Sequence, residues 1–134
     1  MKTEIEIERD FYTLIKESPL GNSIRGTVYR SEMRPAGADG EDLIVKFLAG
    51  VDEQIQSGTM LLNLYVPGIE IKGGRKVADK QRIGELQRLI LDFVEQYEND
   101  EYWIKTDGTP YSTYNPDIEQ HLIVTRLKFQ RLSD

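Results

Sequence analysis

The amino-acid sequence predicts an α+β fold, a mainly antiparallel sheet of four to five strands with two helices packed on one face. Residues 58–66 and 119–132 alternate between apolar and polar side chains, as half-buried strands do. Residues 4–17 and 80–98 instead carry apolar side chains at every third or fourth position, which is typical of amphipathic helices. Runs of strands separated by one strong helix favour a segregated α+β arrangement.

The N-terminal segment is expected to form the first helix, over residues 4–17. Its apolar stripe consists of Ile7, Phe11, Leu14 and Ile15. Ser18-Pro19 and then Gly21 mark the end of this helix. The opening letters TEIEIE also alternate, so a short strand at that point stays an alternative.

Three strand-like segments follow, at residues 23–30, 42–49 and 58–66. The third of them is apolar on both faces. One face holds Met60, Leu62, Leu64 and Val66, and the other holds Leu61 and Tyr65 around the polar Asn63. This pattern predicts a central strand, or a strand whose second face meets a partner subunit.

The second half of the chain is expected to start with a polar connection over residues 68–79, in which Asp79 caps the following helix. The later elements are a helix at 80–98, a strand at 102–106, a turn at 107–110, an extended or looped stretch at 111–117 and a strand at 119–132. The order is α-β-β-β-α-β-β. Because no linker, repeat or low-complexity tract interrupts it, residues 1–134 are expected to form one domain.

The composition excludes several kinds of site. The 134 residues include no cysteine, which removes disulfides, thiolate nucleophiles and Cys-type zinc sites. The charged N-terminus lacks the apolar region of a signal peptide, and the longest apolar runs are too short to span a bilayer, so no membrane partner is expected. The net charge of −6 opposes nonspecific grip on phosphate backbones and favours solubility.

The loop AGADGED, residues 36–42, has the acids and glycines of a cation or phosphate site but the wrong spacing. An EF-hand needs oxygen ligands at alternating positions and a closing glutamate, and a phosphate loop needs Gly-Lys-Ser/Thr before a helix. Neither pattern is present. The loop is therefore expected to be a mobile bend between two strands, with its acids in solvent.

Two further sets of residues have ordinary structural explanations. His121, the only histidine, has no cysteine partner or serine motif nearby, so a place on the polar face of a strand is favoured over acid–base chemistry. Four aromatic residues could stack on bases, but without a basic surround packing or a subunit interface is favoured. They are Tyr102, Trp103, Tyr111 and Tyr114.

The triplet Glu70-Ile71-Lys72 raises an alternative function. Restriction-type metal nucleases place an acid-x-Lys triplet on the third strand of an α-β-β-β-α-β core, where two carboxylates hold a divalent metal and the lysine orients water. The second carboxylate would be Asp42 or Asp52. Pro67-Gly68 breaks the strand before the triplet and two glycines follow it, which favours a loop instead.

Several segments together carry a resemblance that covers nearly the whole chain. They are the first helix ending in SPLG, the pieces VYR and MRP, the strands EDLIVKF and SGTMLLNLYVPG, the helix ADKQRIGELQRLILDFV and the strand HLIVTRLKF. In this arrangement the chain resembles the phage tail-completion or tail-terminator family, the small neck and tail proteins of siphophages and prophages. The polar stretch IEIKGGRK before the second helix departs from that family's pattern.

The resemblance implies a structural protein that assembles into a ring, commonly a hexamer, at the junction of tail and head. Its partners would be copies of itself, tail-tube proteins and head-connector proteins, with no sequence-specific nucleic acid. DNA would pass through the lumen, where an acidic lining would reduce sticking. No catalytic residue, metal or cofactor is implied, and the location would be the virion or the host cytoplasm during assembly.

Subunit contacts are expected at two places in this chain. Leu61 and Tyr65 lie on the second face of the strand at 58–66, and Arg34 and Asp39 lie in the loop at 34–41. Two alternatives from other classes remain. One is the metal-dependent nuclease described above, and the other is an intracellular protein-binding module.

Overall fold

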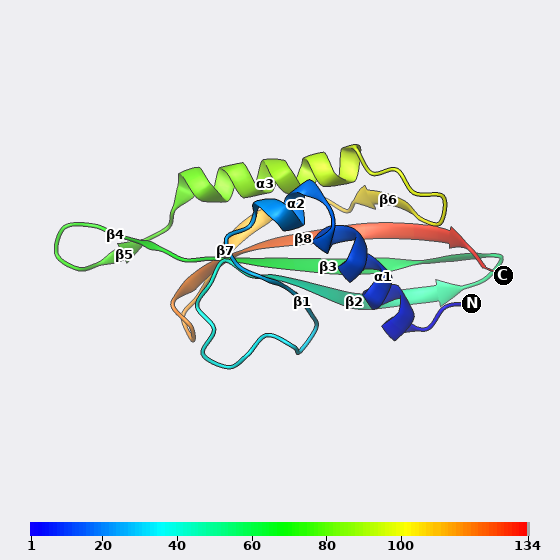
Figure 1. Ribbon diagram of the computed structural model, residues 1–134, viewed down its shortest axis with the longest axis horizontal. Helices are drawn as coiled ribbons and strands as arrows, with labels where there is room; N and C mark the ends of the chain where they lie inside the picture. Colours follow the sequence, from blue (N-terminus) through cyan, green and yellow to red (C-terminus); the bar gives the residue numbers. More distant parts are fainter. Residues whose placement is uncertain (134) are drawn as a thin grey trace.

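Three long strands run along the molecule in the computed structural model, which describes residues 1–133 (Figure 1). They are β2 (Leu43–Asp52), β3 (Ile55–Val66) and β8 (Gln120–Leu132). The shorter strands are β1 (Val28–Arg30), β4 (Ile69–Glu70), β5 (Lys76–Val77), β6 (Trp103–Thr106) and β7 (Tyr111–Asn115). The helices within this range are α1 (Glu4–Lys16), α2 (Pro19–Ser23) and α3 (Lys80–Glu95).

The main sheet has six strands in the order β1-β2-β3-β8-β6, with β7 also paired to β8. All pairs are antiparallel except β1 with β2. The predicted α+β class with a mainly antiparallel sheet is confirmed, and the strand number is slightly higher than the four to five expected. The additional strand arises because β8 is long enough for β7 to pair with its first half and β6 with its second half.

The connection between β1 and β2 differs from the expected bend. β1 and β2 are parallel, with Val28 opposite Leu43 and Arg30 opposite Val45. Residues 31–42 must therefore return the chain to the end of the sheet where β1 began, and they form a crossover rather than a hairpin turn. Alternation within each segment gives no sign of relative direction, so the sequence could not reveal this.

Helix α1 begins at a capping box. The Thr3 hydroxyl accepts a hydrogen bond from the Glu6 N–H, and the Glu6 carboxylate accepts one from the Thr3 N–H. The predicted helix is confirmed, and its stripe buries Ile7, Phe11 and Ile15. The five-residue α2 follows, with Ser18 as its N-cap and Pro19 in its first turn. It is too short to leave a periodic signal, so only its proline and glycine were visible in the sequence.

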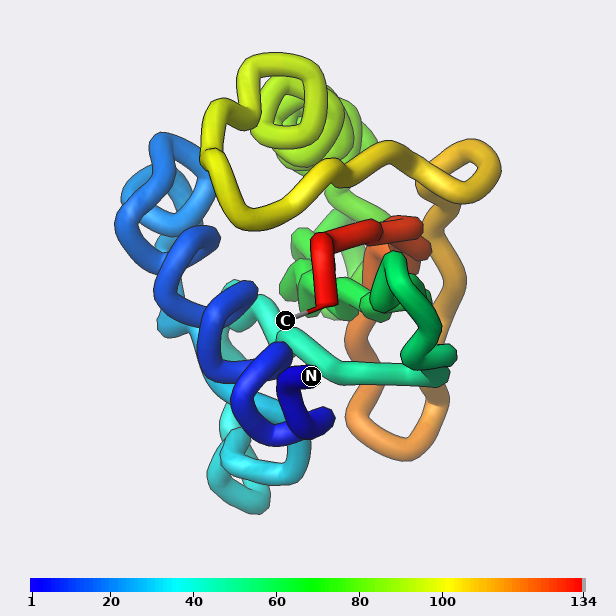
Figure 2. Tube along the Cα trace, turned by 90° about the vertical axis from the view of Figure 1, so that its right-hand side faces the viewer, coloured from blue at the N-terminus to red at the C-terminus, as the bar shows by residue number. Residues whose placement is uncertain are grey.

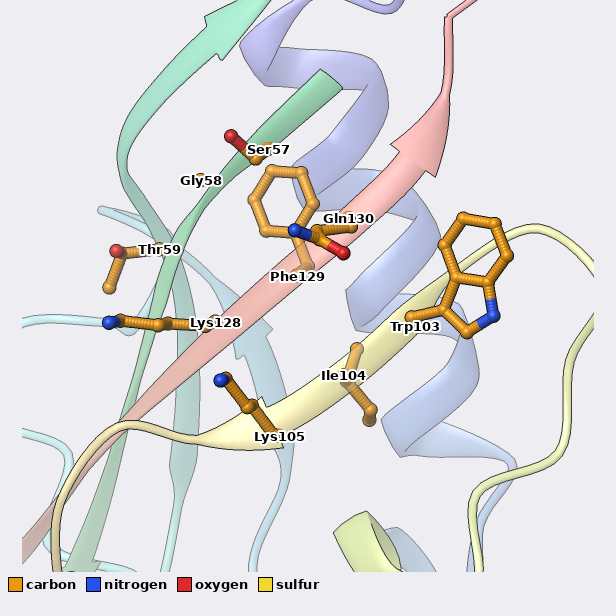
Figure 3. A pocket seen from close by; sticks show the side chains of 9 residues that line it. All are labelled: Ser57, Gly58, Thr59, Trp103, Ile104, Lys105, Lys128, Phe129 and Gln130. Atoms are coloured by element: carbon orange, nitrogen blue, oxygen red, sulfur yellow. The ribbon is translucent and has the colours of Figure 1, made fainter. Parts of the chain in front are cut away.

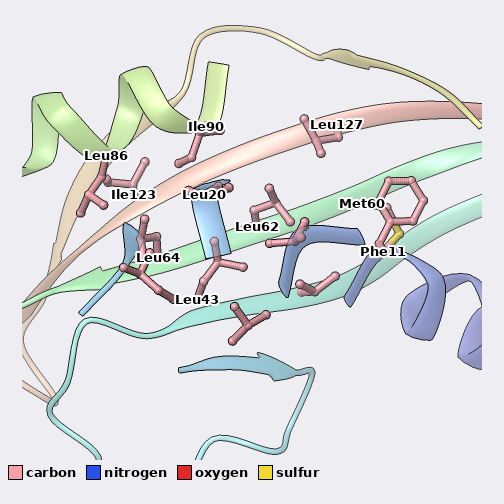
Figure 4. Packing of buried hydrophobic residues seen from close by; sticks show 14 of the residues in the cluster. Phe11, Leu20, Leu43, Met60, Leu62, Leu64, Leu86, Ile90, Ile123 and Leu127 are labelled. Atoms are coloured by element: carbon pink, nitrogen blue, oxygen red, sulfur yellow. The ribbon is translucent and has the colours of Figure 1, made fainter. Parts of the chain in front are cut away.

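Helices α1 and α3 cover the same face of the sheet (Figure 2). Figure 4 shows the core between them, where Phe11 from α1 and Leu86 and Ile90 from α3 point toward the sheet. The Asp79 cap is confirmed, because its carboxylate accepts a hydrogen bond from the Arg82 N–H at 3.2 Å. The sheet side of the core is made of Leu43, Val45, Met60, Leu62, Leu64, Val66, Ile123, Leu127 and Phe129.

Two departures from regular structure affect the surface. Strands β4 and β5 pair as a small hairpin that projects from one end of the molecule (Figure 1), within the stretch expected to be an irregular connection. Its turn uses Gly73 and Gly74 at positive φ, a conformation that suits glycine. In β2 the register against β3 shifts between Phe47 and Ala49, so Leu48 is an extra residue, a β-bulge.

Tyr102 is expected to make the fold sensitive to alkali. Its ring packs against Phe11 and Phe129, and its hydroxyl donates a hydrogen bond to the Asp10 carboxylate at 2.7 Å. Burial, and then the Asp10 hydrogen bond, raise the pKa of Tyr102 above its ordinary value of 10.0, and burial also raises the pKa of Tyr97. Their contribution to stability is therefore fully present below about pH 10, where the unfolded chain begins to ionise, and is lost as the pH rises further.

Urea unfolding at about pH 8 and about pH 11 measures this loss, and we expect a clearly lower free energy of unfolding at the higher pH. The variant Tyr102→Phe should show a smaller difference between the two pH values than the parent chain. If all seven tyrosines developed tyrosinate absorbance near pH 10 while the fold stayed intact, this account of Tyr102 would be wrong.

Candidate interaction surface

The sheet face opposite the helices is the candidate functional surface, and we call it the open face. Along β3, side chains alternate between the buried core and this face, which therefore holds Leu61, Asn63 and Tyr65. Their partners on the neighbouring strands lie on the same face: Lys46 and Ile44 from β2, and Leu122, Val124 and Arg126 from β8. The helices within residues 1–133 pack on the other face of the sheet, and Arg34 of the 31–42 crossover lies over Tyr65 on this one.

The centre of the open face contains a polar atom without a partner. Asn63 lies between Ile44 on one side and Val124 on the other. Its Oδ1 atom is buried and accepts no hydrogen bond from any described residue. A buried unpaired acceptor is costly in a folded chain, and this one is already shielded from solvent by its own chain, so it marks a polar atom enclosed within the packing of the open face.

Of the four predicted contact residues, Arg34 is committed to its own chain. Its guanidinium lies over the Tyr65 ring at 4.0 Å from the ring centre, and its Nε donates to Asp42 at 2.9 Å. It also donates to the Gly40 carbonyl and the Gln120 side chain. Arg34 and Tyr65 are thus brought together, whereas Leu61 remains half-buried on the open face.

The fourth predicted residue, Asp39, is exposed on the 31–42 crossover. Its carbonyl accepts a hydrogen bond from the Gln120 amide at 2.8 Å. Together with the Arg34 bonds, this contact ties the crossover to the start of β8.

Two acids of the crossover are buried, which corrects the expectation that they lie in solvent. Glu41 and Asp42 are each 4% exposed. Asp42 accepts hydrogen bonds from the Thr27 N–H and from Arg34. Glu41 accepts two from the Arg82 guanidinium, at 2.6 and 2.9 Å, and one from the Arg25 N–H at 3.0 Å.

Hydrogen bonds to the Glu41 carboxylate raise the pKa of the Arg82 guanidinium above its ordinary value. Burial of the guanidinium acts in the opposite direction but is the smaller effect. Both acids thus act as anchors for the crossover and not as ligands for a cation. Only the folded arrangement reveals this, because their partners come from α3, from the residues before β1 and from Arg34 at the other end of the crossover.

A row of basic side chains crosses the open face, and we call it the basic band. Within β8, Arg126 and Lys128 point outward, and Lys128 lies directly opposite Lys105 of β6. Lys46 lies in the same row as Arg126, across Leu61. The only acid that an ion pair places near them among residues 1–133 is Asp107, at 3.6 Å from Arg126 and 3.7 Å from Lys128.

Like charges opposite each other on a sheet are destabilising, so a band of four cations is unusual for a chain of net charge −6. The sequence did not disclose it, because the four residues come from three separate strands. One part of it follows from the sequence, because the alternation over residues 119–132 puts Arg126 and Lys128 on the same face of the last strand.

A groove of about 530 Å³ lies beside the basic band, on β3, β8 and β6 (Figure 3). Trp103 borders it and is 57% exposed, which is high for so large an apolar side chain. Lys105 and Lys128 line the same groove. An exposed tryptophan beside cations is typical of the energetic hot spots of protein interfaces and not of surfaces that only contact water.

The other three aromatic residues are separated. Tyr102 is in the core, and Tyr111 and Tyr114 are exposed on β7. His121 lies at the start of β8, half-buried, with its ring centre 5.0 Å from that of Tyr114. No stacking platform joins these rings with Trp103.

The residues of the nuclease alternative do not come together. Glu70 and Lys72 lie on the projecting hairpin, whereas Asp52 lies at the opposite end of the sheet, about 30 Å away along β3 at 3.3 Å per residue. Asp42 has both carboxylate oxygens engaged by Thr27 and Arg34. Within residues 1–133, no group of three or more acidic, histidine or cysteine side chains is placed to hold a metal ion.

Comparisons of this chain with protein families and with curated proteins found no match, so the open face is the main guide to function. No helix in residues 1–133 combines the length and apolar character needed to cross a membrane.

Proposed function

We propose that this chain is a structural protein of a phage or prophage tail, a tail-completion or tail-terminator-like subunit that assembles into a ring at the junction of tail and head. The observation that carries the proposal is the open face: a six-stranded sheet is covered by helices on one side only. The uncovered side presents the half-buried Leu61 and the exposed Trp103. Such a surface suits a subunit that is completed by its neighbours.

The order of elements supports the same reading. The chain runs from an amphipathic helix through strands and a second long helix to a final long strand, as the segments that resemble the tail-terminator family do. The projecting β4–β5 hairpin adds reach beyond the sheet, with Ile69 and Ile71 exposed on it. In the proposed ring this hairpin is free to touch a neighbouring subunit, the tail tube or the connector.

Mass in solution tests the proposal directly. Size-exclusion chromatography with light scattering is expected to give a closed oligomer, six chains by resemblance, and negative-stain electron microscopy should show rings. A single chain at every concentration up to the solubility limit would contradict the proposal and would favour the protein-binding module instead.

Replacing Leu61 with glutamate is expected to reduce the measured mass to that of one chain. The change removes apolar contact area and places a charge where a neighbour would exclude water. The fold should survive, because Leu61 lies between Lys46 and Arg126 on the sheet and these cations accommodate the new carboxylate. Light scattering measures the mass, and circular dichroism checks the fold.

The matched control is Ile5→Glu, which puts the same charge at an apolar position that is already 57% exposed on α1. This variant should keep the oligomer. If the Leu61 variant and the parent chain have equal masses, the open face does not take part in the subunit contacts.

A further inference from the structure

Two clusters of like charge lie at different places on the molecule. The open face holds the basic band, Lys46, Lys105, Arg126 and Lys128, against the single acid Asp107. The end of α3 and the following loop hold an acidic segment, residues 92–101, which includes no lysine or arginine. Its acids are Asp92, Glu95, Glu98, Asp100 and Glu101.

The acidic segment leads directly into β6, but no ion pair within residues 1–133 joins it to the basic band. Figure 2 shows the first part of this segment beside the end of α3, on the helical side of the sheet. Glu101 is paired with Lys2 and Arg131, and Asp92 with Arg88. Glu95, Glu98 and Asp100 are exposed and have no ion pair within residues 1–133, and the same holds for Lys46 and Lys105.

We propose that the basic band of one copy docks on the acidic segment of the next copy, with Trp103 as the apolar anchor of the contact. This inference rests on the proposed ring and names its subunit contact. Two different surfaces of the same chain meet, so the contact is head-to-tail, and repetition of such a contact closes into a ring when the rotation between copies allows it. Complementary charges also fix the register and exclude a face-to-face pair, in which two basic bands would repel.

A second copy fits the open face better than a nucleic acid does. A polyanion would be repelled by the net charge of −6, whereas a second copy offers a local cluster of acids. Trp103 is exposed, whereas the nearby rings of Tyr102 and Phe129 are buried and cannot continue a row of stacked bases. The docking also removes two costs at once, because it neutralises both the paired lysines of the sheet and the clustered acids of the segment.

The test is a charge exchange between two variants. Lys46→Glu with Lys105→Glu turns the basic band acidic, and Glu95→Lys with Glu98→Lys turns the acidic segment basic. None of these four side chains has an ion pair within its own described chain, so each variant should fold. We expect each variant alone to have the mass of one chain by light scattering, and an equimolar mixture to recover the parent oligomer, because each altered surface then meets an opposite charge.

The matched control is Arg9→Glu with Lys80→Glu, which makes the same change in net charge at exposed basic side chains of α1 and the start of α3. Its mass should equal that of the parent chain. The oligomer formed by the mixture should also dissociate more readily as salt is raised, since a Debye length of about 8 Å at physiological salt falls to about 3 Å at 1 M.

The possible failures are distinguishable. A parent chain that is monomeric throughout would end the proposed ring itself. A parent oligomer that survives Lys46→Glu with Lys105→Glu would leave the ring but overturn this contact, and so would variants that dissociate but do not recover on mixing. Fluorescence anisotropy with a labelled single-stranded oligonucleotide covers the remaining case. If the parent chain binds the oligonucleotide, and Lys46→Glu with Lys105→Glu abolishes this binding without changing the mass, the open face is a nucleic-acid surface instead.

Discussion

Replacing Glu41 with alanine is expected to lower the free energy of unfolding by about 3–5 kcal/mol, because the largely buried charge of Arg82 loses its buried partner and keeps only the half-exposed Glu85. The Glu41 side chain is 3% exposed and the Arg82 side chain 12%. Two short hydrogen bonds join them, at 2.6 and 2.9 Å, and Glu41 also accepts from the Arg25 N–H. One carboxylate therefore fastens the crossover to α3 and to the chain before β1.

Glu85 supplies the matched control, since its carboxylate pairs with the same guanidinium at 3.2 Å but is half exposed. Glu85→Ala should cost no more than about 1 kcal/mol, as exposed ion pairs do. Glu41→Gln keeps the shape and one acceptor and should fall between the two. Urea unfolding of the three variants decides the matter: a Glu41→Ala cost close to that of Glu85→Ala would mean that the buried pair does not hold the crossover.

Replacing Phe11 with alanine is expected to cost about 3–5 kcal/mol, as the removal of a buried phenylalanine does. Phe11 is fully buried, and its ring centre lies 5.0 Å from that of Tyr102 and 5.6 Å from that of Phe129. It is the point where α1, the segment before β6 and the last strand meet. The cavity left by alanine would loosen all three, so we also expect α1 amides to exchange faster with solvent.

The control for Phe11 is Ile5→Ala on the exposed side of the same helix, which should change stability by less than about 0.5 kcal/mol. Thermal and urea unfolding measure both variants. A Phe11→Ala cost near that of Ile5→Ala would show that α1 is not held by this aromatic cluster.

The elements that could be predicted from the sequence are those whose pattern is contained within one segment. The alternation of β3 identified both of its faces, and the stripe of α1 named Phe11 as a core residue. The parallel direction of β1 was not predictable, because direction depends on where the 31–42 crossover returns. The β4–β5 hairpin was missed since its strands are two residues each, too short for alternation.

The candidate surface was predictable only in part, for a related reason. Leu61 and Tyr65 could be placed on the second face of their strand from spacing alone. Arg34 contacts Tyr65, which is 31 positions later in the chain, and Glu41 contacts Arg82, which is 41 positions later. Only the fold reveals contacts between residues so far apart in the sequence. The basic band has the same origin: Lys105 and Lys128 become neighbours only when β6 pairs with β8.

Leu48, the extra residue in β2, affects how sheets of different molecules can join. β1 pairs only with Leu43–Val45, so the outer edge of β2 beyond that point carries backbone groups that no described strand engages. A flat edge of this kind would be a template for fibre growth, but the bulge breaks its regular spacing and Lys46 adds a charge beside it. The bulge and the charge thus oppose open-ended strand-to-strand polymerisation. Subunits that join through side chains instead can form a particle with a fixed number of copies.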